Sequence, residues 1–198
     1  SLFYHGLVIA SNLEIEYKEK RNSHYLADLM GLFFLGIFFN DKLTGKKWSE
    51  FARNEIEKEI HYQFYPDGVL FEDSTSYHRF ACETLLLCGA LAKHNNISFS
   101  KKFNFQLYKS ILFLKDIIQK NNSVPQFGDN DNSRILQFHG FNQDLVTDHR
   151  HLAALGGEYF DDDNLRLSGL GSEIDAIWIM GNFKKNLRGV CRRCAGRC

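Results

Sequence analysis

Residues 72–79 bring together side chains that could transfer protons: two carboxylates, three hydroxyls, a phenol, an imidazole and a guanidinium. A turn at 66–68 precedes them and the apolar segment 80–91 follows, so we expect them at the start of a buried helix. Ser74 or Ser76 would cap this helix by accepting hydrogen bonds from its first N–H groups. Titratable groups at a helix start suit acid–base chemistry, and a polar cap without catalytic function is the alternative.

A second polar group, Asn22-Ser23-His24-Tyr25, precedes another apolar segment, 26–39. Asn22 or Ser23 would cap this second helix. If the two helix starts face one cleft, the imidazole of His24 and the phenol of Tyr77 would lie on the same groove. Otherwise His24 is more simply a structural histidine whose ring nitrogens are satisfied by neighbouring groups.

The elements that must position these groups are all predicted to be helices. We expect them over residues 2–13, 26–39, 48–60, 80–91, 105–118, 148–157 and 172–180. Asn40-Asp41 and Thr44-Gly45 should end the second of these helices, and 161–163 should form a solvated loop. No run of alternating strands appears, so the predicted fold class is all-α, built from antiparallel helix hairpins.

Composition and charge exclude several classes of function. The chain has 198 residues, 44% of them hydrophobic, and its 24 Lys and Arg residues balance 24 Asp and Glu residues. There is no global basic surface for nucleic acid, so we expect no nucleic-acid partner. The longest apolar run, 29–39, has about eleven residues and is too short to span a bilayer.

No metal or cofactor is expected from the sequence. Cys191, Cys194 and Cys198 are spaced like zinc ligands but have no nearby fourth ligand. The loop at 124–134 begins like a calcium loop, yet Arg134 stands where that motif requires Gly and Gly140 where it requires Glu. Residues 182–198 form a basic, cysteine-containing tail, which we expect to be disordered or outside the domain.

Several ordered motifs resemble those of heparinase II/III-like proteins. The run Asn22-Ser23-His24-Tyr25-Leu26-Ala27-Asp28-Leu29, followed by Gly31-Leu32, is similar to the N-N-H-Y-L-A-N-L-x-G-L helix of that family. Asp67-Gly68, Glu72, Ser74 and Tyr77-His78-Arg79 resemble a second motif, and residues 125–131 resemble its P-x-x-G-D-x-D loop. Asp148-His149-Arg150-His151-Leu152 also resembles the family, and the matches span roughly residues 1–180.

The resemblance implies an incomplete (α/α) toroid of the chondroitin AC/alginate lyase type, occupying residues 1–181. In that family the toroid is followed by a C-terminal β-sandwich, so we expect this chain to be a fragment of a longer parent whose β-sandwich and upstream helices lie outside the given sequence. A cleft walled partly by that missing domain would position substrate poorly, so we expect little turnover from these 198 residues alone.

The activity implied by the resemblance is β-elimination on a uronic-acid-containing polysaccharide, which makes the chain part of a carbon–oxygen lyase. By resemblance, Asn22 and His24 would bind the uronate carboxylate, Tyr77 would be the base or acid, and His78 would support it. Further contacts to the anionic glycan would come from Arg79, Glu72, Ser23 and His149.

One departure from the family leaves a second function open. The family has Asn directly before the His, whereas this sequence has Ser23. The alternative is therefore a non-catalytic glycan-binding or scaffold toroid in polysaccharide biosynthesis. A degradative lyase would be periplasmic or secreted, a biosynthetic scaffold cytoplasmic, and the sequence assigns neither the compartment nor the glycan.

Overall fold

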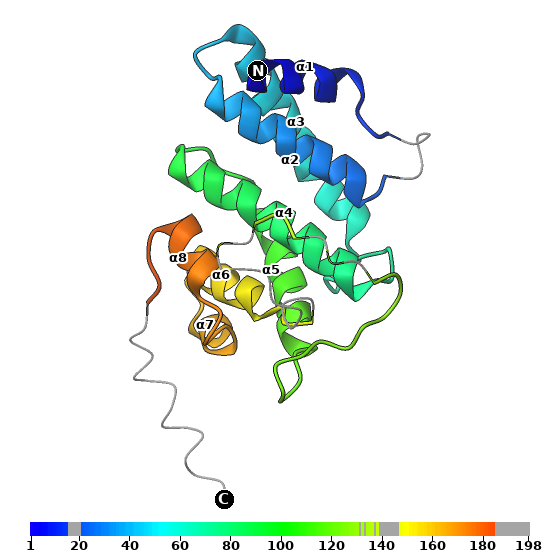
Figure 1. Cartoon of the computed structure of the whole chain (residues 1–198), viewed down its shortest axis with the longest axis vertical. Coiled ribbons are helices and arrows are strands. Elements are labelled where there is room, and N and C mark those ends of the chain that lie inside the picture. Colours follow the sequence, from blue (N-terminus) through cyan, green and yellow to red (C-terminus); the bar gives the residue numbers. More distant parts are fainter. Residues whose placement is uncertain (16–20, 131, 133, 137, 139–146, 185–198) are drawn as a thin grey trace, which may run out of the picture.

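The computed structural model describes residues 1–15, 21–130, 132, 134–136, 138 and 147–184. Within these residues the chain forms eight helices and no strand, with one isolated antiparallel bridge between Phe64 and Leu70. The all-α prediction is therefore confirmed (Figure 1). The toroid remains a prediction, and most of the tail, from residue 185 onward, lies outside the described residues.

The first three helices, α1 (Leu2–Ser11), α2 (Ser23–Phe38) and α3 (Leu43–Gln63), pack together at one end of the molecule (Figure 1). α2 and α3 form an antiparallel hairpin with a very close approach: a Cβ on Gly36 would lie 2.4 Å from the backbone nitrogen of Ser49. The prediction that Thr44-Gly45 ends a helix is wrong. α2 already ends at Phe38, and Thr44 and Gly45 lie in the first turn of α3.

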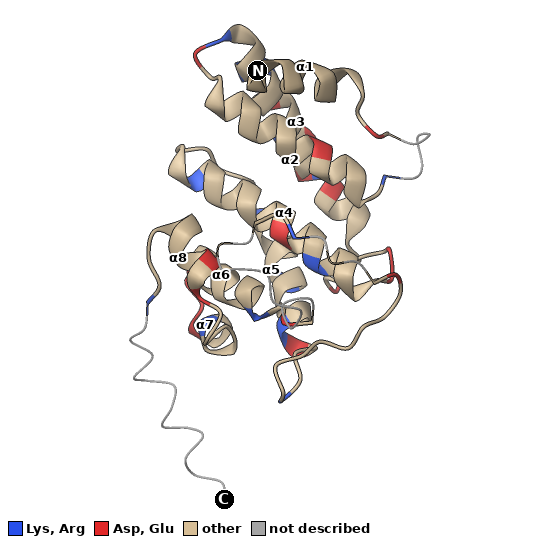
Figure 2. Cartoon of the chain, in the orientation of Figure 1, with Lys and Arg blue, Asp and Glu red and all other residues tan. Residues whose placement is uncertain are grey.

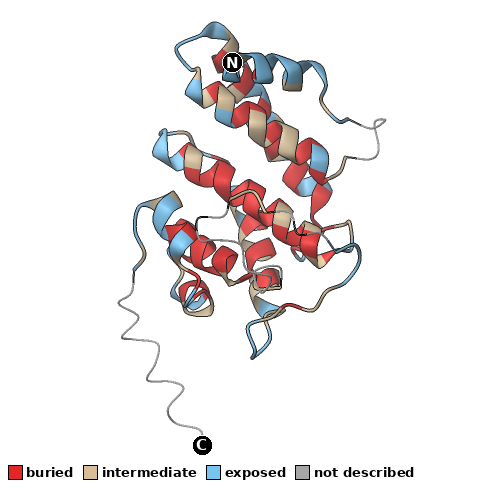
Figure 3. Cartoon of the chain, viewed as in Figure 1, coloured by how far each residue is buried: buried red, intermediate tan, exposed pale blue. Residues whose placement is uncertain are grey.

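The central element is α4 (Thr75–His94), which is buried along most of its length (Figure 3). It packs against α2 on one side and against α5 (Lys101–Asp116) and α6 (Arg150–Phe160) on the other. A helix that is covered on several sides must be apolar on several faces, as the sequence of α4 is. α4 therefore joins the α1–α3 layer to the rest of the molecule.

Two short helices, α7 (Asp163–Ser168) and α8 (Ile174–Met180), complete the fold beside α6. The prediction of a solvated loop at 161–163 is wrong in part. Asp162 caps α7 by accepting from the N–H groups of Asn164 and Leu165. The acidic run 161–163 therefore contains the N-cap and the first residue of α7, which its composition alone does not indicate.

In the described part of the chain, no helix is both long and apolar enough to cross a bilayer. Helix α1 carries no Lys, Arg, Asp or Glu, as Figure 2 shows, but has only ten residues. No group of three His, Cys, Asp or Glu side chains suited to a metal occurs among the described residues. The three C-terminal cysteines lie outside them.

Candidate functional site

A pocket of about 210 Å³ lies where the first turn of α2 meets the first turn of α4. The imidazole of His24 and the phenol of Tyr77 both line it, so the two helix starts do face one cleft. Pockets that enclose a whole drug-sized ligand hold roughly 300–1,000 Å³, so this one suits a segment of a longer molecule. Its described lining residues are Glu14, Ser23, His24, Ala27, Asp28, Tyr77 and Phe80.

Asn22 is the N-cap of α2, because its Oδ1 accepts from the N–H groups of His24 (3.2 Å) and Tyr25 (3.4 Å). Ser23 is buried, and its N–H donates to Glu72 Oε1 at 2.9 Å. The Ser23 hydroxyl lies 3.5 Å from the other oxygen of that carboxylate. Glu72 therefore holds the start of α2 in place, which differs from the substrate contact expected for it.

His24 is the most accessible of the predicted site residues on α2, with 66% of its side chain exposed. Its Nδ1 lies 2.9 Å from Glu14 Oε2. Because a carboxylate only accepts, Nδ1 carries a proton, and Nε2 is the ring atom available to a ligand. This orientation of the ring is set by the segment that connects α1 to α2.

The wall of the pocket is acidic on the α2 side. Asp28 lies one turn after His24 and accepts the backbone N–H of Glu14 at 2.8 Å. Desolvation raises the pKa of Asp28 above its ordinary value, and the hydrogen bond from Glu14 opposes that rise. Among the described residues that line the pocket, His24 is the one that can carry a positive charge.

The α4 wall begins with Ser74, the N-cap that the sequence predicted as one of two candidates. Its hydroxyl oxygen accepts from the N–H of Tyr77 at 3.1 Å and donates to the carbonyl of Asp129 at 2.6 Å. The same hydroxyl therefore ties the start of α4 to the loop at 124–130. Tyr77 takes its position from this first turn.

The loop at 124–130 is fastened to α4 by further contacts. Thr75 N–H donates to the carbonyl of Phe127, and Phe127 N–H donates to Thr75 Oγ1, both at 3.2 Å. Gly128 has φ +67°, and a Cβ there would lie 2.3 Å from the carbonyl oxygen of Asp73. The loop that resembles P-x-x-G-D-x-D therefore needs its glycine to reach the turn on which Tyr77 lies.

His78 points into the core rather than into the pocket. Its Nδ1 accepts the N–H of Leu70 at 3.2 Å, and its Nε2 donates to the carbonyl of Ser110 at 3.0 Å. The rings of Phe64 and Phe113 pack edge-on against it. Consecutive helix residues point about 100° apart, so His78 and Tyr77 cannot share one face. In the described structure His78 therefore has packing and hydrogen-bonding contacts in the core, and its catalytic role stays a prediction.

Arg79 and His149 are also fully buried, and neither lines the pocket. Arg79 Nη1 lies 3.5 Å from His149 Nε2, at the start of α6. His151 is buried nearby, and burial together with the charge of Arg134 holds its pKa well below the ordinary value. These basic groups are buried and are not among the lining residues, so direct contact with a glycan would require the site to open.

Sequence reasoning missed Glu14, Asp28 and Phe80 as lining residues. Asp28 lies four residues after His24 on one helix face, a spacing that could have indicated it. Phe80 likewise follows Tyr77 by three residues. Glu14 carried no such signal, because its place depends on how the segment after α1 folds back over α2.

Comparison with known proteins identifies the family to which the chain belongs. The family model "Heparinase II/III N-terminus" matches residues 4–145. The chain therefore belongs to the heparinase II/III family, a family of polysaccharide lyases.

The chain is also similar to a heparin-sulfate lyase of Pedobacter heparinus, with 29% identity over 135 residues. That match covers 65% of this chain but only 20% of the relative, so the chain spans about a fifth of the length of the lyase it matches. No solved structure matches the chain.

Proposed function

We propose that this chain is the helical part of a lyase that cleaves a uronic-acid-containing polysaccharide by β-elimination. The observation that carries the proposal is the pocket lined by both His24 and Tyr77, in a chain of the heparinase II/III family. A polymer would lie across the pocket with one sugar ring inside it. This agrees with the pocket's small volume and with the similarity to a heparin-sulfate lyase.

The chemistry assigns distinct tasks to the two walls. Removing the proton on C5 of a uronate places charge on the neighbouring carboxylate as an enediolate, which requires hydrogen-bond donors. His24 Nε2, when protonated, and the Nδ2 amide of Asn22 are the donors at the start of α2. Tyr77, as the phenolate, takes the C5 proton and becomes the phenol. The C4–O4 bond then breaks as the C4–C5 double bond forms, and the phenol returns its proton to the departing O4.

The other predicted residues support this arrangement indirectly. Glu72 holds Ser23 and hence the first turn of α2, while His78 anchors α4 in the core. The guanidinium of Arg79 contributes positive charge close to Tyr77 on α4, which favours a negatively charged phenol oxygen and a bound polyanion, and His149 holds that guanidinium from the start of α6. In this proposal they act through the electrostatic field of the site rather than by touching substrate.

A non-catalytic glycan-binding or scaffold function is the second candidate. Ser23 stands where the family has Asn, and although it lines the pocket it is largely buried and its short hydroxyl lies 3.5 Å from Glu72 Oε2. Glu14 and Asp28 also place two carboxylates where an anionic sugar would bind. Both features would weaken stabilisation of an enediolate more than they would weaken binding.

The test is to incubate the protein, in its longest natural form, separately with alginate, heparan sulfate and chondroitin sulfate. The unsaturated uronate product of β-elimination is followed by its ultraviolet absorbance, and binding is measured in parallel by affinity electrophoresis. Tyr77→Phe should lower the elimination rate by roughly 10²–10⁴-fold while binding is kept, since the phenol contributes proton transfer.

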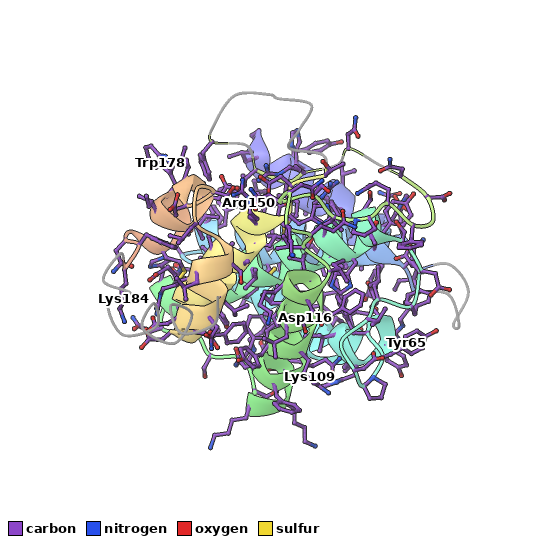
Figure 4. All side chains as sticks on the ribbon, turned by 90° about the horizontal axis from the view of Figure 1, so that it is seen from below. Tyr65, Lys109, Asp116, Arg150, Trp178 and Lys184 are labelled. Carbon is purple, nitrogen blue, oxygen red and sulfur yellow. The ribbon has the colours of Figure 1, made fainter. Side chains whose placement is uncertain are left out.

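Tyr65→Phe is the matched control, because Tyr65 is exposed at the edge of the molecule, away from the pocket (Figure 4). This variant should retain full activity. Binding to a uronic glycan without any elimination product would favour the scaffold function. Absence of both binding and product on all three glycans would refute both candidates.

A further inference from the structure

We infer that Gln63, the last residue of α3, is the positioning residue that sets how the two walls of the pocket lie relative to each other. This inference rests on the proposed function for its consequence, but its structural part stands independently. Gln63 does not line the pocket, and no resemblance pointed to it. Its side chain is 0% exposed.

Gln63 closes a ring of hydrogen bonds between the starts of the two walls. Its side-chain Nε2 donates to the backbone carbonyl of Asn22 at 2.9 Å. The backbone carbonyl of Gln63 accepts the N–H of Phe71, also at 2.9 Å. Glu72, the next residue, accepts the N–H of Ser23, which follows Asn22. The ring therefore runs from α2 through Gln63 to the segment leading into α4, and back to α2 through Glu72.

The orientation of the Gln63 amide is determined by its second proton. Nε2 also lies 3.3 Å from Glu59 Oε2, and Glu59 is a buried carboxylate paired with Arg21 at 2.5 Å. Both amide protons are thus directed, one to Glu59 and one to Asn22. Arg21 directly precedes Asn22, so the Glu59 pair holds the same turn from its other side.

The amide oxygen of Gln63 is buried without a hydrogen-bond partner among the described residues. A glutamine here makes sense if its N–H groups serve the position of Asn22. Through these two hydrogen bonds Gln63 fixes the backbone at Asn22 and hence the start of α2.

The ring transmits position to Tyr77 because the 70–72 segment is fixed to α4 as well. Leu70 N–H donates to His78 Nδ1, and His78 is the residue after Tyr77. Leu70 also forms the bridge with Phe64, the residue after Gln63. A displacement at Gln63 would therefore change the separation of His24 from Tyr77.

The experiment compares Gln63→Met with Gln106→Met. Gln106 is a matched control: it too is buried, and its Nε2 donates to a backbone carbonyl, that of Tyr65, at 2.7 Å, away from the pocket. Methionine preserves the length of the side chain and removes the side-chain hydrogen bonds, whereas the backbone bond between Gln63 and Phe71 remains. The first readout is the imidazole ¹⁵N spectrum of His24, assigned with His24→Gln.

The inference predicts that Gln63→Met shifts the His24 ring signals and that Gln106→Met leaves them in place. With a heparan sulfate oligosaccharide, kcat should fall roughly ten-fold in Gln63→Met and KM should change little, since misplacement affects the reacting geometry more than the binding surface. Unchanged His24 signals in folded Gln63→Met would overturn the inference. Shifted signals in a protein that has no lyase activity would refute only the proposed function.

A second variant keeps the test decisive if Gln63→Met does not fold. Glu72→Gln weakens the opposite link of the ring, at Ser23, and retains the size of the side chain. It should shift the same His24 signals. In the double variant the two shifts should not add, because each change opens the same ring. Additive or absent shifts would contradict the coupling.

Discussion

The Nε2 atom of His78 lies 3.0 Å from the carbonyl oxygen of Ser110, inside the core and against the ring of Phe113. Burial lowers the pKa of His78 to about 4, although the hydrogen bond to Ser110 opposes this shift. The histidine is thus neutral in the folded protein at neutral pH. It acts as a hydrogen-bonded spacer between α4 and α5.

This relationship predicts a loss of stability in mild acid. The unfolded chain, with a histidine pKa of about 6.5, binds more protons than the folded chain between about pH 4 and 6.5. The contribution of His78 is therefore complete above about pH 6.5 and decreases as the pH falls towards 4, by up to about 3 kcal/mol.

Urea unfolding between pH 4.5 and 7.5 measures this dependence. His78→Gln should be less stable at neutral pH and should show a flatter pH profile, because the titrating group is gone. His61→Gln, a change at an exposed site on α3, should keep the wild-type profile. His151, whose pKa is also lowered, leaves a residual slope of the same sign in every variant.

Replacing Arg166, whose guanidinium is buried and does not line the pocket, should strongly lower the stability of the fold. It pairs with Glu158 at 2.6 Å, Asp161 at 2.6 Å and Asp163 at 2.5 Å. Arg166→Met should lower the free energy of unfolding by about 3–5 kcal/mol, because the buried carboxylate of Glu158 loses its partner. Thermal and urea unfolding measure this. Lys47→Met, at an exposed site, should change stability by less than about 0.5 kcal/mol.

The close approach of Gly128 to Asp73 predicts that the conformation of the 124–130 loop affects glycan binding at the pocket. Gly128→Ala would combine a positive φ with a clash against Asp73, so we expect a loss of about 2 kcal/mol of stability and weaker glycan binding. Gly181→Ala is the matched control, with φ +80° but open space around the Cβ, and should lose about 1 kcal/mol without affecting binding. Equal effects of both variants on binding would argue against the coupling.

Removing the carboxylate of Asp28 should strengthen glycan binding, in contrast to the weaker binding expected for Gly128→Ala. Asp28→Asn removes a negative charge from the pocket wall and keeps an oxygen that can accept from Glu14. We expect the Kd for an anionic oligosaccharide to fall about two- to five-fold at low salt, less at high salt. Asp116→Asn, at the exposed end of α5 (Figure 4), should leave it unchanged in titration calorimetry at both salt concentrations.

The sequence alone was sufficient for the fold class, the family and the two polar helix starts. Helical periodicity and capping residues such as Asn22 and Ser74 act over one or two turns, so their meaning is visible in a short stretch. The same locality explains the errors at Thr44-Gly45 and at Asp162. Glycine and aspartate are found both at helix starts and in loops, and the packing of the flanking segments decides between them.

Only the tertiary structure decided which polar side chains reach the pocket. His78, Arg79 and Tyr77 are neighbours in the sequence, yet the first two turn into the core and the third lines the cleft. Their directions depend on which faces of α4 are covered by α5 and α6, which are contacts between distant segments. Gln63 and Glu14 gain their importance in the same way, because hydrogen bonds between residues far apart in the chain leave no local pattern to detect.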